Sequence, residues 1–284
     1  MDKYIDIKLE CNGKILEIGK DKLYKLINIE GISSSEYSVD IVNNAQFDGG
    51  TVKSKRVESR LITITAEYPS TEDTETRRQN LIRFFNPYLT GKLYVNYSGV
   101  KRVINYEVAG FKDSRENLYD PLKFIINLIC PNPFFKDERE FSKNMAGKIN
   151  SITVPFTIPA SGMIMSAKVL RQEATIINNG DKDTGLIISF IAKGEVSNPK
   201  IENLTTGKFL RIVVDLMPGD ILTINTNKGN KRIELNGKNI SQKMDRSSSF
   251  IDMQVGENIL KYSADKGYTN LNVYPKWTAE FFGV

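Results

Sequence analysis

The sequence predicts a mainly β protein of two domains: an N-terminal domain of strands with one α-helix, and a C-terminal β-sandwich or jelly roll. Three observations support this fold class. Short apolar segments alternate with polar residues along much of the 284-residue chain, as they do in half-buried strands. Glycine-containing turn dipeptides recur roughly every dozen residues in the second half, as in all-β sandwiches. One segment has the apolar spacing of an amphipathic helix.

The first domain is predicted to open with a hairpin. Ile5, Ile7 and Leu9 alternate with charged residues, and Asn12-Gly13 supplies a turn pair that tolerates positive φ. Further strands are expected from an apolar or β-branched pattern in the segments 23–30, 37–42, 60–67, 92–97, 102–108 and 121–130. The last of these is apolar at most positions, which favours a buried central strand.

A single helix is predicted after the capping sequence 70–73, ending before Pro87, with a length of about four turns. Its apolar residues are expected to share one face: Leu81, Phe84, Phe85 and Tyr88. Three arginines lie on its other faces, where solvation or ion pairing is a simpler role than anion binding: Arg77, Arg78 and Arg83.

Residues 31–55 contain many turn signals and few apolar anchors. Two interpretations stay open for this segment. It is either an arm that reaches a neighbouring molecule or a surface loop that folds on its own domain.

The second domain is predicted to begin near Phe141, as a series of short strands separated by turns. The strand candidates are 152–156, 174–178, 186–192, 200–203, 209–215, 220–225, 231–235, 250–253, 258–262, 271–274 and 277–282. No helical pattern interrupts them, which is typical of a sandwich or jelly roll.

The composition excludes several kinds of chemistry. The chain has no histidine, which removes histidine-dependent catalysis and most transition-metal sites. The glycine motifs of nucleotide-binding loops and of esterases do not occur. The segment 181–185 imitates half of a calcium loop, but Ala192 stands where a bidentate acid is needed, so it reads as a polar turn. No metal or cofactor is expected.

Charge and cysteine usage point to a protein without a nucleic-acid or membrane partner. The net charge is +5, with 20 basic and 20 acidic residues in 1–138 and 19 and 14 in 139–284. The surplus forms no basic run interleaved with aromatics, so nucleic-acid binding is not expected. No apolar stretch is long enough for a membrane span, and the start lacks the order of a signal peptide, which predicts synthesis in the cytoplasm. Cys11 and Cys130 form no paired motif and are expected to be buried thiols.

Four aromatic residues near the end of the chain have two interpretations: Tyr262, Tyr268, Tyr274 and Trp277. They could form a face that stacks on a sugar or contacts a partner. Packing in the core is the other use, because the strands that carry them also carry Leu260, Leu271 and Val273.

The segment 129–135, ICPNPFF, closes an apolar strand with two prolines and two phenylalanines. Pro131 and Pro133 cannot donate to a sheet ladder and favour extended geometry before them, so they end the strand in a stiff exit. Phe134 and Phe135 are expected to pack near a junction between the two domains.

The order of these features resembles the distal tail protein family of long-tailed bacteriophages, also called the siphovirus tail component. In the first half the matching segments are Phe47-Asp48-Gly49-Gly50, Arg60-Leu61-Ile62-Thr63-Ile64, Arg78-x-x-Leu81-x-x-Phe84, Leu89-x-Gly91-Lys92-Leu93 and Ile129 to Phe135. In the second half they are Asn178-Asn179-Gly180-Asp181, Thr184-Gly185, Asn198-Pro199-x-Ile201-x-Asn203, Gly219-Asp220, Asn225-Thr226, Gly256-x-Asn258 and Trp277-x-x-x-Phe281-x-Gly283-Val284. Each motif consists mainly of residues that are common in turns, so the resemblance depends on the order and spacing of the motifs.

The resemblance implies a structural protein of the virion, located at the distal end of a phage or prophage tail. Residues 1–138 would be a β-sandwich-like domain that forms a hexameric ring between the tail tube protein and the tail-associated tip protein. Residues 139–284 would be a galectin-like sandwich that projects outward and can carry a receptor-binding protein or side fibres. The junction residues would hold that sandwich at a fixed angle. The resemblance implies no enzyme activity.

Two other functions remain open beside the tail hub. A carbohydrate-binding module for host cell-wall glycans is the first, although galectins use a histidine in their sugar groove and this chain has none. A hydrolase that uses a pair of carboxylates is the second.

Overall fold

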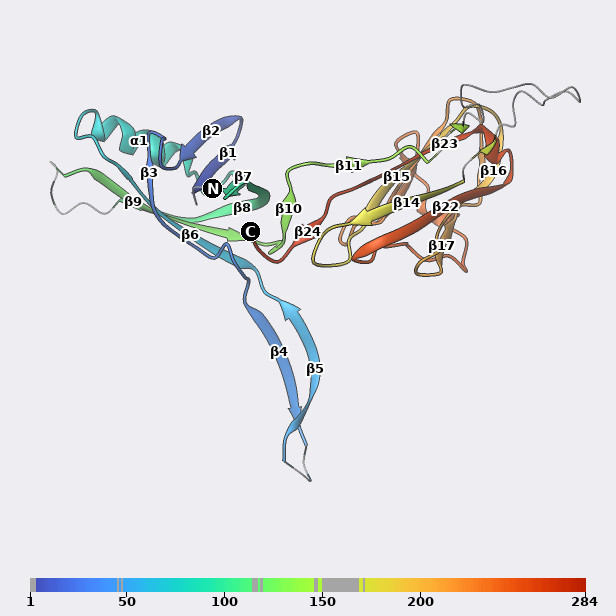
Figure 1. Cartoon of the computed structure of the whole chain (residues 1–284), viewed down its shortest axis with the longest axis horizontal. Helices are drawn as coiled ribbons and strands as arrows, with labels where there is room; N and C mark the ends of the chain where they lie inside the picture. Colours follow the sequence, from blue (N-terminus) through green and yellow to red (C-terminus); the bar gives the residue numbers. More distant parts are fainter. Residues whose placement is uncertain are drawn as a thin grey trace, which may run out of the picture. The chain divides into compact units, whose positions relative to one another are not determined.

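The computed structural model describes residues 4–44, 46, 48–113, 117, 120–145, 148–149, 169–170 and 172–284. The chain forms two compact units (Figure 1): unit 1 is Met1–Glu138 with Glu280–Val284, and unit 2 is Arg139–Ala279. The mainly β class is confirmed, and one α-helix occurs in the part of the chain that is described. The predicted second domain ran to residue 284, whereas residues 280–284 cluster with unit 1.

Unit 1 is built on one antiparallel sheet. Its strands run in the order β2 (Lys14–Ile18), β1 (Ile5–Cys11), β7 (Thr90–Tyr97), β8 (Val100–Asp113), β9 (Leu122–Cys130), β6 (Arg60–Tyr68) and β3 (Lys25–Glu30). Two short strands extend it, because β10 (Phe135–Asp137) pairs with both β8 and β24 (Glu280–Phe281). An isolated parallel bridge joins Ile18 to Tyr24, the residue before β3.

The core of unit 1 follows from the period of two in its strands. In β6, Ile62, Ile64 and Ala66 are buried, and Ile64 faces Ile126 of β9 in the ladder. Strand β9 is central, as predicted, but its two faces differ: every second residue is buried, whereas Ile129 on the other face is 39% exposed. The apolar sequence of β9 therefore predicts more burial of its second face than the structure shows.

The helix α1 spans Thr74–Phe84, which is 11 residues and shorter than the predicted four turns. It starts after Asp73, whose backbone is left-handed, and ends at Phe85. Leu81, Phe84 and Phe85 are buried as predicted, and Phe85 stacks on Phe111 of β8 with 5.5 Å between ring centroids. Tyr88 was expected on the same face but lies beyond the end of the helix and is 92% exposed.

Arg78 forms the kind of ion pair that was expected for the helix arginines, whereas Arg77 contacts an aromatic ring instead. Arg78 pairs with Glu75 at 2.9 Å, one turn earlier on the helix. Arg77 lies over the ring of Tyr68, with 5.7 Å from its Cζ atom to the ring centroid.

The segment that follows β3 leaves the sheet as a hairpin arm (Figure 1). It consists of β4 (Tyr37–Asn43) and β5 (Gly50–Val57), which pair only with each other. Strands β4 and β5 therefore do not fold back on the sheet of unit 1, whereas Ile32 and Ser35, which precede β4, are buried.

Unit 2 is a sandwich of two antiparallel sheets. One sheet has the order β11 (Phe141–Ser142), β23 (Leu271–Trp277), β15 (Leu186–Ala192), β19 (Ile221–Asn225), β20 (Arg232–Leu235) and β21 (Lys238–Asn239). The other has β14 (Glu173–Asn178), β22 (Gly256–Lys266), β16 (Val196–Asn203) and β17 (Lys208–Arg211), with β18 (Asp215–Leu216) beside β16. A separate pair is formed by β12 (Lys148–Ile149) and β13 (Val169–Leu170), and two 3-10 turns are η1 (Ser241–Lys243) and η2 (Tyr268–Asn270).

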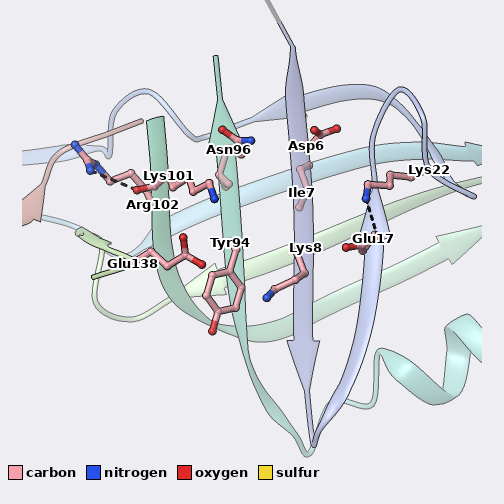
Figure 2. A pocket seen from close by; sticks show the side chains of 11 residues that line it. Asp6, Ile7, Lys8, Glu17, Lys22, Tyr94, Asn96, Lys101, Arg102 and Glu138 are labelled. Atoms are coloured by element: carbon pink, nitrogen blue, oxygen red, sulfur yellow. Dashed lines mark hydrogen bonds and ion pairs between the residues drawn. The ribbon is translucent and has the colours of Figure 1, made fainter. Parts of the chain in front are cut away.

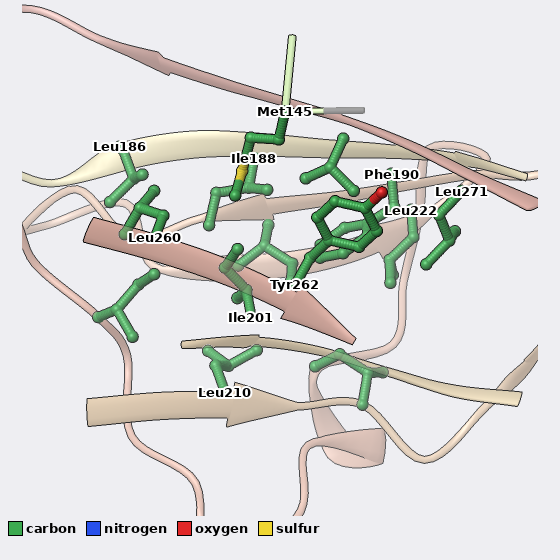
Figure 3. Close-up of a cluster of buried hydrophobic side chains, with 14 of the residues drawn as sticks. Met145, Leu186, Ile188, Phe190, Ile201, Leu210, Leu222, Leu260, Tyr262 and Leu271 are labelled. Carbon is green, nitrogen blue, oxygen red and sulfur yellow. The ribbon is translucent and has the colours of Figure 1, made fainter. Parts of the chain in front are cut away.

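The inner faces of the two sheets form one apolar core (Figure 3). Ile188 and Phe190 of β15 come from one sheet, and Ile201 of β16 and Leu260 of β22 from the other. The predicted strand at 250–253 is reduced to an isolated bridge between Thr184 and Met253. The predicted strand at 152–156 lies outside the described residues.

Candidate assembly surface

The arm has one apolar and one polar face. Tyr37, Val39 and Ile41 alternate along β4, so they point to one side, and their partners on that side include Val57 and Val52 of β5. A register shift between Asp40 and Ile41 marks a bulge, which increases the local twist. The opposite face carries mainly polar residues together with the exposed Val42: Ser38, Asp40, Val42, Thr51, Ser54 and Arg56. On the first face, Lys55 lies opposite Val39 and is the charged residue among the apolar ones.

Among the described residues of unit 1, none buries the apolar face of the arm. The large apolar side chains Tyr37, Val39, Ile41 and Val52 are 46–58% exposed. An isolated two-stranded hairpin is only marginally stable in water, because it buries too little surface to offset the loss of chain entropy. A contiguous apolar patch on such an element marks a site of protein contact.

The base of the arm is organised by one buried arginine. Arg60, the first residue of β6, is 1% exposed. Its Nε atom donates to the carbonyl of Pro133 at 2.8 Å, Nη1 to that of Gly31 at 2.5 Å, and Nη2 to that of Phe282. Burial lowers the pKa of the guanidinium, whose charge is solvated by carbonyl dipoles.

The junction residues predicted from the sequence all lie in unit 1. Phe135 is fully buried, with its ring centroid 4.8 Å from Cζ of Arg60. Phe134 is half-buried and packs against Phe282 at 5.7 Å between ring centroids. Pro133 is buried and Pro131 is exposed. The two phenylalanines therefore contribute to the base of the arm as well as to the end of β9.

The four aromatic residues of unit 2 do not share an exposed face. Tyr262 is 1% and Trp277 8% exposed, and the indole Nε1 of Trp277 donates to the carbonyl of Ile177 at 3.2 Å. Tyr274 is partly buried, and its hydroxyl accepts a hydrogen bond from Asn144 at 3.3 Å. Tyr268 is 37% exposed and lies in η2. Burial of two of the four favours the core-packing interpretation over a sugar-stacking face.

An open groove of about 330 Å³ crosses β2, β1, β7 and β8 of unit 1 (Figure 2). Its charged lining is mixed in sign: Lys8, Lys22, Lys101 and Arg102 with Asp6, Glu17 and Glu138. Lys22 pairs with Glu17 at 2.9 Å, and the Nζ atom of Lys8 lies 4.3 Å from the ring centroid of Tyr94. The groove is open and strongly charged, whereas small-molecule sites are enclosed and mostly apolar, so it does not resemble a site for a small molecule.

A second hollow, of about 350 Å³, lies beside α1 and is mostly apolar. Ile82, Phe85 and Pro87 line it from the helix side, and residues 108–111 with Asp113 from β8. The register of β8 against β9 shifts between Val108 and Gly110, which places this hollow at a bulge. Unit 1 thus carries apolar surface in two different places, on the arm and beside the helix.

Among the described residues we find no group of three or more His, Cys, Asp or Glu side chains that could hold a metal ion. In the same part of the chain, no helix is long and apolar enough to span a membrane. Cys11 and Cys130 are free and buried, as predicted. Burial raises the pKa of the Cys130 thiol to about 12, so it is not an activated nucleophile.

Sequence reasoning missed the role of Arg60 and the pairing of β24 with unit 1. The available signal for Arg60 was an arginine at the head of an otherwise apolar, β-branched strand. A charged residue in such a position must find buried partners. Which carbonyls it meets is decided by segments far apart in the sequence.

Comparison with known proteins agrees with this architecture. Residues 179–281 match the family model of the siphovirus-type tail component, C-terminal domain. The Dit (gp 19.1) protein of phage SPP1, described as a paradigm of the hub adsorption apparatus in phages that infect Gram-positive bacteria, has a TM-score of 0.69 and 15% identity. That match covers 97% of this chain and 99% of the SPP1 protein.

Two structures of the phage P2 baseplate in its activated conformation, with Ca and with Sr, also match. Each has a TM-score of 0.52 and covers 98% of this chain, with 10% and 9% identity and coverage of 98% and 99% of the phage P2 chains. No curated protein matches the chain in sequence.

The fold and these matches define the class: the chain is a structural component of a phage tail or baseplate. Residues 179–281 of unit 2 match the siphovirus-type tail component, C-terminal domain, and the whole chain shares its fold with the SPP1 Dit protein. The resemblance to the distal tail protein family that the sequence motifs predicted is confirmed.

Proposed function

We propose that this protein is a hub of the tail tip, in which copies of unit 1 join head to tail into a closed ring, expected to be a hexamer. The ring would connect the tail tube protein to the tail-associated tip protein at the distal end of the virion. Unit 2 would serve as the platform for a receptor-binding protein or side fibres. In this role the protein acts through contacts and performs no bond chemistry.

The observation that carries the proposal is the uncovered apolar face of the arm. A head-to-tail interface requires two different surfaces on each copy, and it closes into a ring when the rotation between copies allows. The arm supplies one of them. The hollow beside α1 is our candidate for the other, because it is apolar and open and because Ile82 at its edge is 41% exposed.

The arm can be tested by placing charge on its apolar face. We expect the wild-type protein to form rings, seen by light scattering and negative-stain microscopy. The double variant Val39→Asp, Ile41→Asp should remain monomeric, because burying two carboxylates at an interface is costly. Its melting temperature should stay unchanged, since both side chains are exposed in the monomer. Thr51→Asp is the matched control, because it adds a charge to the other face of the same arm.

A mixing experiment tests the head-to-tail geometry. Ile82→Asp should also abolish rings if the hollow receives the arm. When the arm variant and the hollow variant are mixed, each retains one intact surface, so they should form a heterodimer and nothing larger. A wild-type chain that stays monomeric at high concentration and joins no tail particle would refute the proposed function.

A further inference from the structure

Residues 280–284 return to unit 1 after the whole of unit 2 has intervened in the sequence. In the β10–β24 ladder Phe281 faces Phe135, and Glu280 faces Lys136 with 3.8 Å between their charged atoms. Cζ of Arg102 lies 3.4 Å from the ring centroid of Phe281. The segment is therefore fixed by backbone pairing and by side-chain contacts.

Beyond the ladder the same segment contacts the base of the arm. The amide of Val284 donates to the carbonyl of Ile32 at 3.0 Å, and Ile32 is buried. Gly283 approaches the backbone of Ser33 so closely that a Cβ atom on residue 283 would collide with the Ser33 carbonyl. Only glycine fits in this place without displacing the chain.

Arg60 ties the segment to both ends of the arm's base. It begins β6, three residues after the last residue of the arm's return strand, and it binds the carbonyls of Gly31, where the arm leaves the sheet, and of Phe282. Gly31 has φ of +82°, and a Cβ there would collide with the carbonyl of Leu61. Both strands of the arm thus leave from a base that includes residues 282–284.

The base matters because β4 and β5 pair only with each other in the sheets that the structure describes. Seven residues of β4 span roughly 23 Å, and a tilt of about 10° at the base would move the tip by about 4 Å. Side chains at a specific interface must fit as closely as those of a protein interior. A displacement of that size would take the apolar face out of register with its partner surface.

We propose that residues 280–284 act as a clamp that sets the direction of the β4–β5 arm, with Arg60 as its positioning residue. The proposal rests on the proposed role of the arm in ring assembly. It assigns to this segment of the chain a function in unit 1: it holds the arm in the one orientation in which a second copy can receive it.

The decisive variant is Gly283→Ala, with Gly110→Ala as its matched control. A Cβ at residue 110 meets nothing closer than 3.7 Å, so the same chemical change is harmless there. Hydrogen exchange is measured in the monomeric Val39→Asp, Ile41→Asp background, so that ring contacts do not protect the arm. We expect Gly283→Ala to speed exchange at least tenfold in residues 32–37 and 56–60, and to leave β9 within twofold of the parent.

The second readout is assembly. In the otherwise wild-type chain, Gly283→Ala should reduce the ring fraction at least fivefold at a fixed concentration. Gly110→Ala serves as a control for exchange only, because Gly110 lines the hollow that is our candidate for the second ring surface. If Gly283→Ala also speeds exchange throughout β9, the milder Phe282→Ala, which removes the ring packed against Phe134 and adds no atom to the base, replaces it. Unchanged exchange at the base of the arm in both variants would overturn the clamp. Absence of rings from the wild type, with the exchange effect present, would instead overturn the proposed function.

Discussion

Replacing the arginine at the base of the arm with an isosteric apolar residue should destabilise unit 1 selectively. Arg60→Met retains most of the packing volume but removes the donors to Pro133, Gly31 and Phe282. Each buried carbonyl left without a donor costs about 1 kcal/mol. The three together give about 3 kcal/mol. We use the low end of the range of about 1 to 3 kcal/mol for each unpaired carbonyl. Burial of the charged guanidinium is itself unfavourable, as its lowered pKa indicates, and removing the charge recovers part of that cost.

The assay uses the position of the single tryptophan. Trp277 lies in unit 2, so its fluorescence reports unfolding of that unit, whereas circular dichroism reports both. We expect Arg60→Met to lower the melting temperature of unit 1 by about 6 to 12 °C and to leave the tryptophan transition in place. Arg60→Lys keeps the charge but cannot reach all three carbonyls, and should cost about 2 kcal/mol. Arg83→Met, on the exposed side of α1, is the control.

The result that would refute this reasoning is a unit 1 transition in Arg60→Met within about 0.5 kcal/mol of the wild type, which is the range of an ordinary surface substitution. In that case the carbonyls would be satisfied by water, and the arginine would not organise the base.

Three further predictions concern other parts of the molecule. Phe135→Ala should cost about 3 to 5 kcal/mol in urea unfolding because its ring is fully buried, whereas half-buried Phe134→Ala should cost less than half of that; equal costs would contradict the assignment. Cys130, with a pKa raised to about 12 by burial, should react with a thiol reagent at pH 8 roughly 10³-fold more slowly in the folded protein than after denaturation; rapid labelling of the native chain would show that the site is open. Asn203→Ala should destabilise unit 2 by about 2 to 4 kcal/mol, as seen by tryptophan fluorescence, because Asn203 donates to the carbonyl of Asp252 at 2.8 Å and accepts from the amide of Thr205 at 3.1 Å; a loss below about 0.5 kcal/mol would refute that role.

The parts of the fold that could be predicted are those written in local periodicity. Strands such as β1, β6 and β9 show their buried face as an alternation of apolar residues, and the turn pairs between strands of unit 2 carry positive φ as the sequence suggests, for example at Asn236 and Gly237. The helix was found for the same reason. Its predicted length was too great because the apolar spacing continues to Tyr88, past the point where Phe85 ends the helix.

The assembly surface could be predicted only in part, because it depends on contacts that are distant in sequence. The few anchors in residues 31–55 suggested an arm, but the alternation that gives β4 one apolar face did not reveal that nothing covers it. Arg60 and Phe282 lie on opposite sides of unit 2 in the sequence, and no local pattern shows that they meet. For the same reason the aromatic residues near the chain end could not be sorted into buried Tyr262 and Trp277 and exposed Tyr268.

The pairing of β10 with β24 also determines when unit 1 can be completed. All of Arg139–Ala279 must leave the ribosome before Phe281 can meet Phe135. At synthesis rates of about 5 to 20 residues per second, that interval lasts on the order of ten seconds. During that interval the nascent chain already contains the β4–β5 arm, but residues 280–284, which complete the base of the arm, have not yet been synthesised. In the proposed ring, neighbouring chains on one messenger would therefore not interlock until residues 280–284 have been synthesised.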